Sequence, residues 1–276
     1  MPDSGIDARL ARRRFERAAP TYRAAARLEA EIGARMLERL DYMKIAPRRI
    51  LDAGSGPPQR ALGKRYRGAQ VIALDYSLAM LRAGRRRFGF WERNPPQPVC
   101  GDFGLLPVAA AAIELVWSNM ALHWAADPLA ALREFHRVLT VEGLLSFSTL
   151  GPDTLAELRA AAGGARVHRF ADMHDLGDML VAAGFAAPVM DMERVTLLYA
   201  DGEALLADLR ASGQTCAGGG RARGLAGTRF RAALGEQLAA RRRGGKLPIS
   251  YEVVYGHAWK PAPRRAADER SVVRFF

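Results

Sequence analysis

The stretch ILDAGSGPPQ, residues 50–59, has the residue types and spacing of a ligand-binding turn. An apolar run predicts a buried strand, Asp52 stands near its end, and Gly54 and Gly56 follow in a tight turn. Glycines let a backbone pass close to a ligand, and the N–H groups that open the next helix favour an anionic group. A dinucleotide-binding turn needs its third glycine at position 59, where this chain has Gln59.

Polar side chains also follow the later predicted strands. Asp75 and Tyr76 close VIALDYS, Asp102 and Phe103 stand in CGDFGLLP, and Asn119 ends VWSN. Because the carboxyl ends of parallel strands meet at one edge of a sheet, we expect these residues to lie near the glycine turn.

Strands and helices alternate through most of the chain, which predicts an α/β fold with a mostly parallel, doubly wound sheet covered on both faces. Helices are predicted near 59–67, 77–89 and 127–139, with Gly143 as the C-cap of the last. Two further helices are predicted, one that begins at Pro152 and another that ends at Gly184. The predicted strands cover residues 49–53, 70–74, 97–100, 113–118, 143–149, 192–200 and 249–261.

An acidic residue two positions before the first glycine resembles the first motif of the S-adenosylmethionine (SAM) methyltransferases of class I. Their third glycine is replaced here by Pro58, which suits the first turn of a helix, so we predict that the helix starts there. The resemblance implies a seven-stranded sheet and SAM as the cofactor. It also implies roles for Asp75 at the ribose, Asp102 and Phe103 at the adenine, and Asn119 near the methionine.

Longer segments narrow this resemblance. RRRFERAAPTYRAAARLE, SNMALHWAADPLAALREFHRVL, LSFSTLGPDTLAELR, HDLGDMLVAAGF and YEVVYGHAWKP are similar to the BioC family, the malonyl-acyl carrier protein O-methyltransferases of biotin synthesis. The similarity runs from about residue 12 to residue 261. The order of the predicted elements indicates a helical cap at 1–42, a methyltransferase domain at 43–261 with a helical insertion at about 201–247, and an irregular tail at 262–276.

This family methylates the free carboxyl of malonyl carried on acyl carrier protein. A carboxylate with a pKa near ~4 is already ionised at neutral pH, so the site needs alignment and no strong base. The resemblance implies that Tyr22 and His123 donate hydrogen bonds to this carboxylate, that Arg159 clamps it, and that Trp124 walls the pocket. Two alternatives stay open: a carboxyl methyltransferase for another small acid or acyl thioester, and a non-methylating assembly factor of the same fold.

The chain is strongly basic, with a formal net charge of +12. Such a surface attracts polyanions, and acyl carrier protein is highly acidic. Candidate contacts are two arginine clusters, Arg12, Arg13 and Arg14 beside the cap, and Arg241, Arg242 and Arg243 in the insertion. A nucleic-acid partner is not expected, because no nucleic-acid-binding motif is present. The abundance of Arg over Lys can also reflect codon bias.

Several classes of protein are not favoured by the sequence. No apolar run approaches the ~20 residues of a membrane span, and the charged first twenty residues predict no secretory signal. Cys100 and Cys216 are isolated, with no CxxC pair and no metal-ligand spacing, so no metal site is expected. These features together predict a cytoplasmic protein without a membrane partner.

Overall fold

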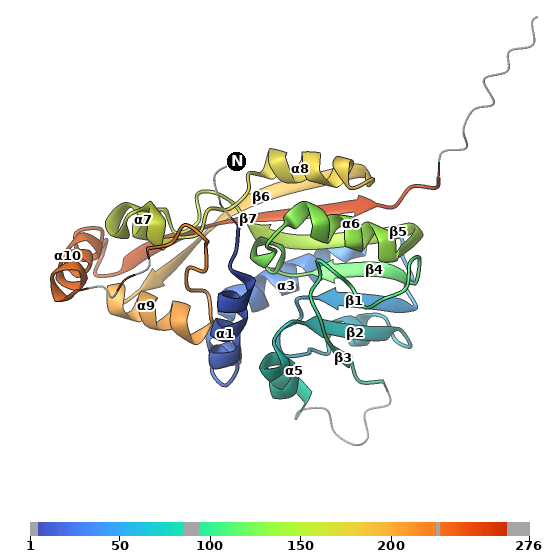
Figure 1. Cartoon of the computed structure of the whole chain (residues 1–276), viewed down its shortest axis with the longest axis horizontal. Coiled ribbons are helices and arrows are strands. Elements are labelled where there is room, and N and C mark those ends of the chain that lie inside the picture. Colours follow the sequence, from blue (N-terminus) through green and yellow to red (C-terminus); the bar gives the residue numbers. More distant parts are fainter. Residues whose placement is uncertain (1–4, 86–93, 223, 225–226, 264–276) are drawn as a thin grey trace, which may run out of the picture.

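A seven-stranded sheet with the strand order β3-β2-β1-β4-β5-β7-β6 forms the centre of the molecule (Figure 1). The computed structural model describes residues 5–85, 94–222, 224 and 227–263. Strands β1 to β5 are parallel, and β7 runs antiparallel between β5 and β6, so the predicted fold class is confirmed. The strands are β1 (Arg49–Ala53), β2 (Gln70–Asp75), β3 (Gln97–Cys100), β4 (Ile113–Ser118), β5 (Leu139–Leu150), β6 (Ala186–Tyr199) and β7 (Leu247–Trp259).

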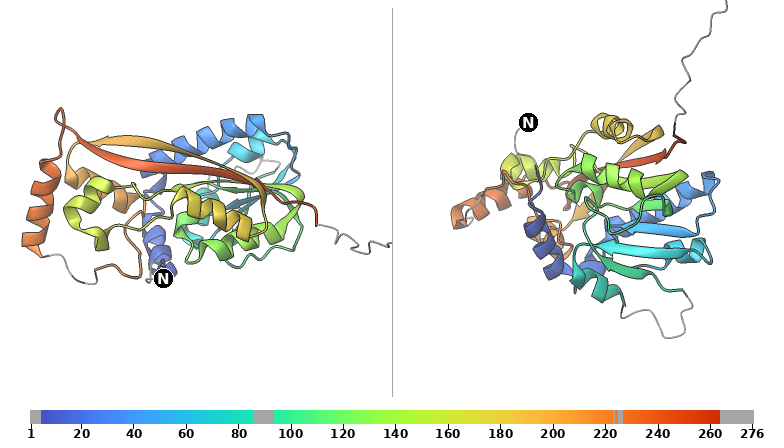
Figure 2. Two further views of the ribbon diagram at one scale, coloured as in Figure 1. Left: turned by 90° about the horizontal axis from the view of Figure 1, so that it is seen from above. Right: turned by 45° about the vertical axis from the view of Figure 1, so that its right-hand side comes forward.

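Helices cover both faces of the sheet (Figure 2). Successive residues of a strand face opposite sides, so in β1 Ile50 joins one hydrophobic core and Leu51 the other. The first core packs α3 and α4 against the sheet, and the second packs α6 and α8. The helices of these two layers are α3 (Arg27–Arg39), α4 (Ala61–Arg65), α6 (Pro128–Val138) and α8 (Met173–Ala182), and α5 (Leu78–Arg85) contacts β2 and β3.

The N-terminal segment and the connection between β6 and β7 add helices beyond the sheet. The N-terminal cap begins with α1 (Ala8–Ala18) and α2 (Tyr22–Ala25) and continues into α3, while α9 (Gly202–Ala211) and α10 (Thr228–Ala239) lie between β6 and β7. These two strands extend beyond the others toward α9 and α10 (Figure 1). The remaining short elements are η1 (Leu40–Tyr42), η2 (Leu122–Trp124), α7 (Ala156–Ala162) and η3 (Gly164–Arg166).

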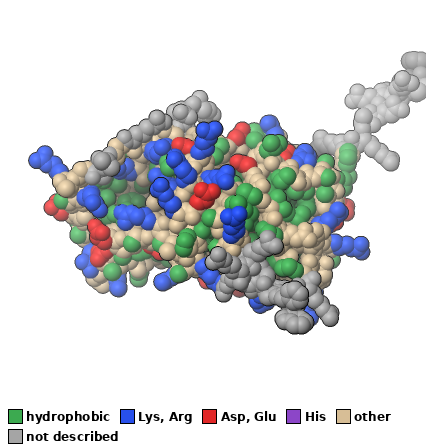
Figure 3. Space-filling model, turned by 60° about the horizontal axis from the view of Figure 1, so that its bottom comes forward, with side chains coloured by type: hydrophobic (Ala, Val, Ile, Leu, Met, Phe, Trp, Pro, Cys, Tyr) green, Lys and Arg blue, Asp and Glu red, His purple; other side chains and the backbone are tan. Residues whose placement is uncertain are grey.

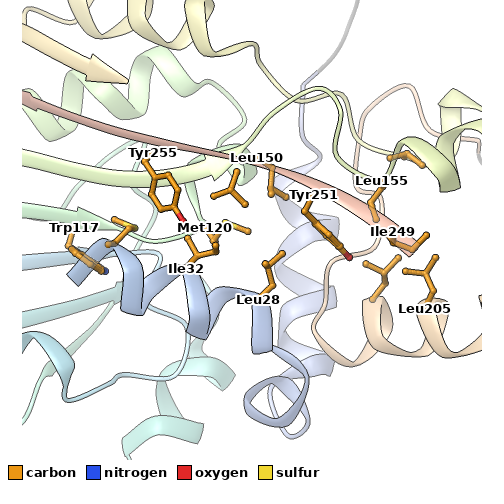
Figure 4. Close-up of a cluster of buried hydrophobic side chains, with 14 of the residues drawn as sticks. Leu28, Ile32, Trp117, Met120, Leu150, Leu155, Leu205, Ile249, Tyr251 and Tyr255 are labelled. Atoms are coloured by element: carbon orange, nitrogen blue, oxygen red, sulfur yellow. The ribbon is translucent and has the colours of Figure 1, made fainter. Parts of the chain in front are cut away.

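One hydrophobic core joins the cap to the insertion. Leu28 and Ile32 of α3 lie near Tyr251 and Tyr255 of β7, and Leu205 of α9 belongs to the same cluster (Figure 4). All five side chains are at most 6% exposed. Because burying such a side chain contributes about 1.5–3 kcal/mol, this core holds the cap and the insertion against the same end of the sheet.

Three predicted helix boundaries are wrong. Helix α6 ends at Val138 and β5 follows at once, so Gly143 lies inside β5, where the pairing with β4 shifts register. Helix α7 begins at Ala156 rather than Pro152, and α4 begins at Ala61 rather than Pro58.

The predicted end of α8 at Gly184 is confirmed. This residue has φ 96°, its N–H donates to Val181, and the N–H of Phe185 donates to Leu180. These hydrogen bonds satisfy the last carbonyl groups of the helix in a Schellman arrangement.

Candidate functional site

A cavity with an empty volume of about 630 Å³ lies at the carboxyl ends of the parallel strands. The strand order reverses between β1 and β4, and residues after both strands line the cavity, as expected for a ligand site in a doubly wound sheet. Helix α1 covers it with Ala8 and Phe15. The predicted site residues that line this first cavity are Tyr22, Gly54, Gly56, Asp75, Tyr76, Asp102, Phe103, Asn119 and Trp124.

The turn after β1 depends on its two glycines. Gly54 has φ 76° and Gly56 has φ 58°, a region that other residues adopt at a cost of about 1–2 kcal/mol. A Cβ on Gly54 would lie 2.3 Å from the Cβ of Ala121, so the turn passes too close to the segment after β4 for any side chain.

Pro58 supports this turn from the side of α5. A Cβ on Gly84 of α5 would lie 2.3 Å from the Cδ of Pro58, so the two backbones are in close contact. The proline therefore packs the turn against α5 and does not open α4. Proline has no N–H to donate, so its part in the turn is this packing contact with α5.

Asp75 fixes the turn to the end of β2. Its Oδ2 accepts the N–H of Gly56 at 2.9 Å, and its Oδ1 accepts the N–H of Ser77 at 2.7 Å. Burial raises the pKa of Asp75 to about 6, although both hydrogen bonds favour the ionised form. Each carboxylate oxygen has a further lone pair, so this group can still accept hydrogen bonds from a ligand.

The residues after β3 form another part of the wall of the first cavity. Asp102 is exposed and its Oδ1 accepts the N–H of Gly104 at 2.7 Å. Phe103 packs edge-on against Phe135 with the ring centroids 6.1 Å apart. The buried hydroxyl of Tyr76 has no hydrogen-bond partner among the described residues, which makes it a donor available to a ligand.

A second cavity, with an empty volume of about 890 Å³, shares Tyr22, Gly54 and Asn119 with the first. Asp52 lines this cavity and not the first one. Burial raises the pKa of Asp52 to about 7, and the nearby charge of Asp75 adds to the effect.

Asn119 is fixed between the cap and the sheet. Its Nδ2 donates to the backbone carbonyl of Glu29 at 2.8 Å, and its Oδ1 accepts from Ser148 at 2.9 Å. A Cβ on Gly33 would lie 3.0 Å from Nδ2, so this glycine lets α3 approach the amide closely. Asn119 therefore holds α3 in place beside the wall that the two cavities share.

Trp124 and His123 are neighbours with different surroundings. Trp124 lines the first cavity and packs edge-on against Phe15 and His168, at 4.9 and 4.8 Å between centroids. His123 lines neither of these cavities; its Nδ1 lies 3.3 Å from the hydroxyl of Thr149. Its buried Nε2 has no partner among the described residues, and burial lowers the pKa of His123 to about 3.

Arg159 also lies outside both cavities. Its Nη2 donates to the carbonyls of Thr154 and Pro152, at 3.2 and 3.4 Å. Thr154 and Glu252 of β7 exchange further hydrogen bonds between hydroxyl and backbone. The GPDTLAELR segment is thus a loop tied to β7, and the guanidinium of Arg159 caps that loop.

One arginine cluster lies on α1 and the other follows α10, and both of these helices contact α9. Arg12 pairs with Glu16 at 3.0 Å, Arg13 is exposed, and Arg14 donates a hydrogen bond to the carbonyl of Cys216. Residues 241–243 follow α10, where Arg241 donates to Gln237 and Arg242 to Gly245, and Arg243 is exposed. Figure 3 shows Lys and Arg side chains gathered over part of one face of the molecule.

Sequence reasoning missed three residues of this region: Phe15, Glu29 and His168. Phe15 covers the first cavity, and its position within a basic run was the only signal for it. Glu29 and His168 are 8% and 7% exposed, and each forms hydrogen bonds with the segment 214–217 of the insertion. No local pattern reveals contacts across so many residues.

In the described part of the chain, no three His, Cys, Asp or Glu side chains are grouped so that they could bind a metal ion. In the same ranges, no helix has both the length and the apolar character needed to cross a membrane.

Comparison with known proteins decides the family. A family model described as a methyltransferase domain matches residues 51–147. A protein of Gallionella capsiferriformans is 50% identical over 99% of this chain and 98% of its own, and one of Methylovorus sp. is 51% identical over 98% and 95%. Both are named malonyl-[acyl-carrier protein] O-methyltransferase. This chain belongs to that family.

Membership of the malonyl-[acyl-carrier protein] O-methyltransferase family confirms the predicted resemblance and the prediction that the protein is a methyltransferase. The solved structure of YcgJ from Bacillus subtilis has a TM-score of 0.60, covers 83% of this chain and 100% of its own, and is 17% identical. At that identity it shows the shared fold alone.

Proposed function

We propose that the protein transfers the methyl group of SAM to the free carboxyl of malonyl bound to acyl carrier protein, as a step of biotin synthesis. The observation that carries this proposal is the name shared by relatives of about 50% identity along nearly the whole chain. The cavity beside the glycine turn supports it, because methyl transfer needs a site that holds the methyl donor next to an acyl group.

The residues of the first cavity fit SAM. The turn at Gly54 and Gly56 lets the backbone approach a ligand, and the buried carboxyl of Asp75 suits the hydroxyls of a ribose. Asp102 and Phe103 would contact the adenine, with Tyr76 as a further donor. Bound there, SAM would supply a methyl group on a positively charged sulfur.

The second cavity extends this site beyond the shared wall. Asp52 would face the methionine end of the cofactor, and Asn119 would hold α3 at the right distance. The two cavities together therefore offer separate surroundings for the nucleoside and for the amino acid part of one ligand.

The substrate carboxylate is already ionised at neutral pH, so the protein has to orient it rather than deprotonate it. Orientation of two reactants can lower a barrier by roughly 7–11 kcal/mol. Burial and the neighbouring carboxyl groups of Glu29, Asp75 and Asp52 raise the pKa of Tyr22, which keeps its hydroxyl protonated. Tyr22 is accordingly our proposed donor to the substrate carboxylate.

His123 and Arg159 have less direct roles in this proposal. His123 would act through its ring contact with Trp124, because Trp124 and not His123 lines the first cavity. Arg159 would keep the loop before α7 in shape through its two carbonyl contacts. We assign it a positioning role.

The partner in this proposal is malonyl-loaded acyl carrier protein, which is strongly acidic. Exposed arginines beside the cap and in the insertion would steer such a partner toward the cavity, through Arg12, Arg13, Arg242 and Arg243. Arg14 and Arg241 would contribute less, since both side chains are partly buried.

The test is a transfer assay with methyl-labelled SAM and carrier protein loaded with malonyl, succinyl or acetyl groups, and with free malonate beside them. Base-labile label on malonyl-carrier protein alone supports the proposal. Label on free malonate or on succinyl-carrier protein would instead support a methyltransferase for another acid. Bound SAM with no transfer to any acceptor would contradict the proposed reaction.

A further inference from the structure

The second cavity is acidic on the cap side. Glu29 of α3 and Asp52 of β1 both line it, and no Lys, Arg or His is among its described lining residues. Glu29 stands between this cavity and a neighbouring one that Gln214 lines. The side chain of Asp52 accepts no hydrogen bond from any described residue, and burial raises its pKa to about 7. A cavity that contains two carboxyl groups and no cation of its own favours a positively charged ligand.

Glu29 differs from the other acidic residues of α3. Glu31 and Glu38 are exposed, whereas Glu29 is only 8% exposed. Burial raises the pKa of Glu29 to about 7, although its own backbone N–H and the amide of Gln214 favour the ionised form. Within the described ranges no basic side chain pairs with Glu29, so a buried carboxylate here would be uncompensated until a cation arrives.

The two cavities meet at Tyr22, Gly54 and Asn119. The hydroxyl of Tyr22 lies close enough to Glu29, Asp75 and Asp52 for all three carboxyl groups to raise its pKa, with Glu29 the strongest of them. Asp75 belongs to the side that we assign to the ribose, and Glu29 belongs to the other side. A ligand whose ribose reaches Asp75 would therefore extend past Tyr22 toward Glu29.

From this arrangement we infer that Glu29 binds the ammonium group at the amino acid end of the cofactor, with Asp52 as the second carboxyl group of that subsite. The inference rests on the proposed function, because it takes the first cavity to hold the nucleoside of SAM. Glu29 is thus assigned as a cofactor-binding residue contributed by the cap.

The insertion positions this residue. Gln214 donates a hydrogen bond to Oε1 of Glu29, and its neighbours tie the same segment to the cap. Arg14 donates to the carbonyl of Cys216, and the N–H of Asp7 donates to the carbonyl of Ala217 at 2.8 Å. The segment that orients Glu29 is therefore held at both α1 and α3.

The test compares two ligands and two variants by calorimetry. S-adenosylhomocysteine has the amino acid group, and 5′-methylthioadenosine lacks it. Glu29→Gln should weaken the binding of S-adenosylhomocysteine about tenfold or more, because the ammonium group loses its charged partner, and should leave methylthioadenosine binding unchanged within about twofold. The matched control Glu31→Gln removes an exposed carboxyl from the same helix and should change neither affinity.

Two results would overturn the inference. Equal weakening of both ligands would make Glu29 a structural residue, and unchanged binding of S-adenosylhomocysteine would exclude the contact. If Glu29→Gln does not fold, the wild-type protein decides: it should bind the deaminated analogue of S-adenosylhomocysteine at least tenfold more weakly, and equal binding refutes the inference. Failure of the wild-type protein to bind either nucleoside would instead refute the proposed function.

Discussion

Replacing Gly54 by alanine tests whether the turn after β1 forms the wall of a cofactor site. The new methyl group would lie 2.3 Å from the Cβ of Ala121, where ordinary van der Waals contact begins at 3.4 Å. The substitution also forces alanine to adopt φ 76°. The backbone contribution is about 1–2 kcal/mol and overpacking contributes about 1–3 kcal/mol, so we expect a loss of about 2–5 kcal/mol in the free energy of unfolding.

Substitutions at two other glycines separate the backbone contribution from the overpacking contribution. Gly68 has φ 89° and no atom near a Cβ, so Gly68→Ala should show the backbone cost alone. Gly63 lies in α4, where a Cβ would be 4.0 Å from Val71, and Gly63→Ala should cost nothing. The double change Gly54→Ala with Ala121→Gly removes the close contact, so it should recover the overpacking part.

Urea unfolding measures stability, and calorimetry with S-adenosylhomocysteine measures binding. We expect Gly54→Ala to lose at least tenfold in affinity, because the turn must move to accommodate the methyl group, while Gly68→Ala keeps wild-type affinity. The reasoning is refuted if Gly54→Ala unfolds like Gly68→Ala and binds the ligand as the wild type does.

Three further predictions concern charge. Asp75→Asn should weaken S-adenosylhomocysteine binding by about tenfold or more in calorimetry, because the acceptor for the ribose loses its charge; unchanged affinity would contradict the assignment. Burial raises the pKa of Glu29 and Asp52 to about 7, above the unfolded values, so their contribution to stability is present at low pH and is lost as the pH rises through 7. Urea unfolding of the ligand-free protein should therefore show a loss of about 1 kcal/mol per group between pH 6.5 and 8, and a loss that persists undiminished in Glu29→Gln would contradict the role of Glu29. Raising the salt concentration should increase KM for the carrier substrate much more than KM for SAM, whereas an equal increase in both would contradict the proposed role of the arginines.

The central strands could be predicted closely because they are continuous apolar runs. The predicted bounds of β1 and β4 agree with the structure, since a mostly buried strand contrasts sharply with the turns beside it. The predicted bounds of β3 agree as well, although this edge strand is mostly exposed. The wrong boundaries have tertiary causes. Pro58 packs on Gly84 instead of starting a helix, and the loop after Pro152 is shaped by hydrogen bonds between Thr154 and Glu252.

The candidate site was predictable where its residues follow strands directly, as Asp75 and Asn119 do. Glu29 was not predictable, because on sequence alone it is one of several acidic residues in a polar helix. Its burial depends on Gln214, which lies 185 residues later in the chain. The surroundings of Arg159 likewise depend on the folded loop, where two backbone carbonyls accept hydrogen bonds from its guanidinium.

The most direct test of the central claim is a crystal structure of the protein with S-adenosylhomocysteine. Electron density is predicted beside the turn at Gly54 and Gly56, with the ribose at Asp75, the adenine at Asp102 and Phe103, and the amino group at Glu29. Density at another place, or none in crystals grown at saturating ligand, would contradict it.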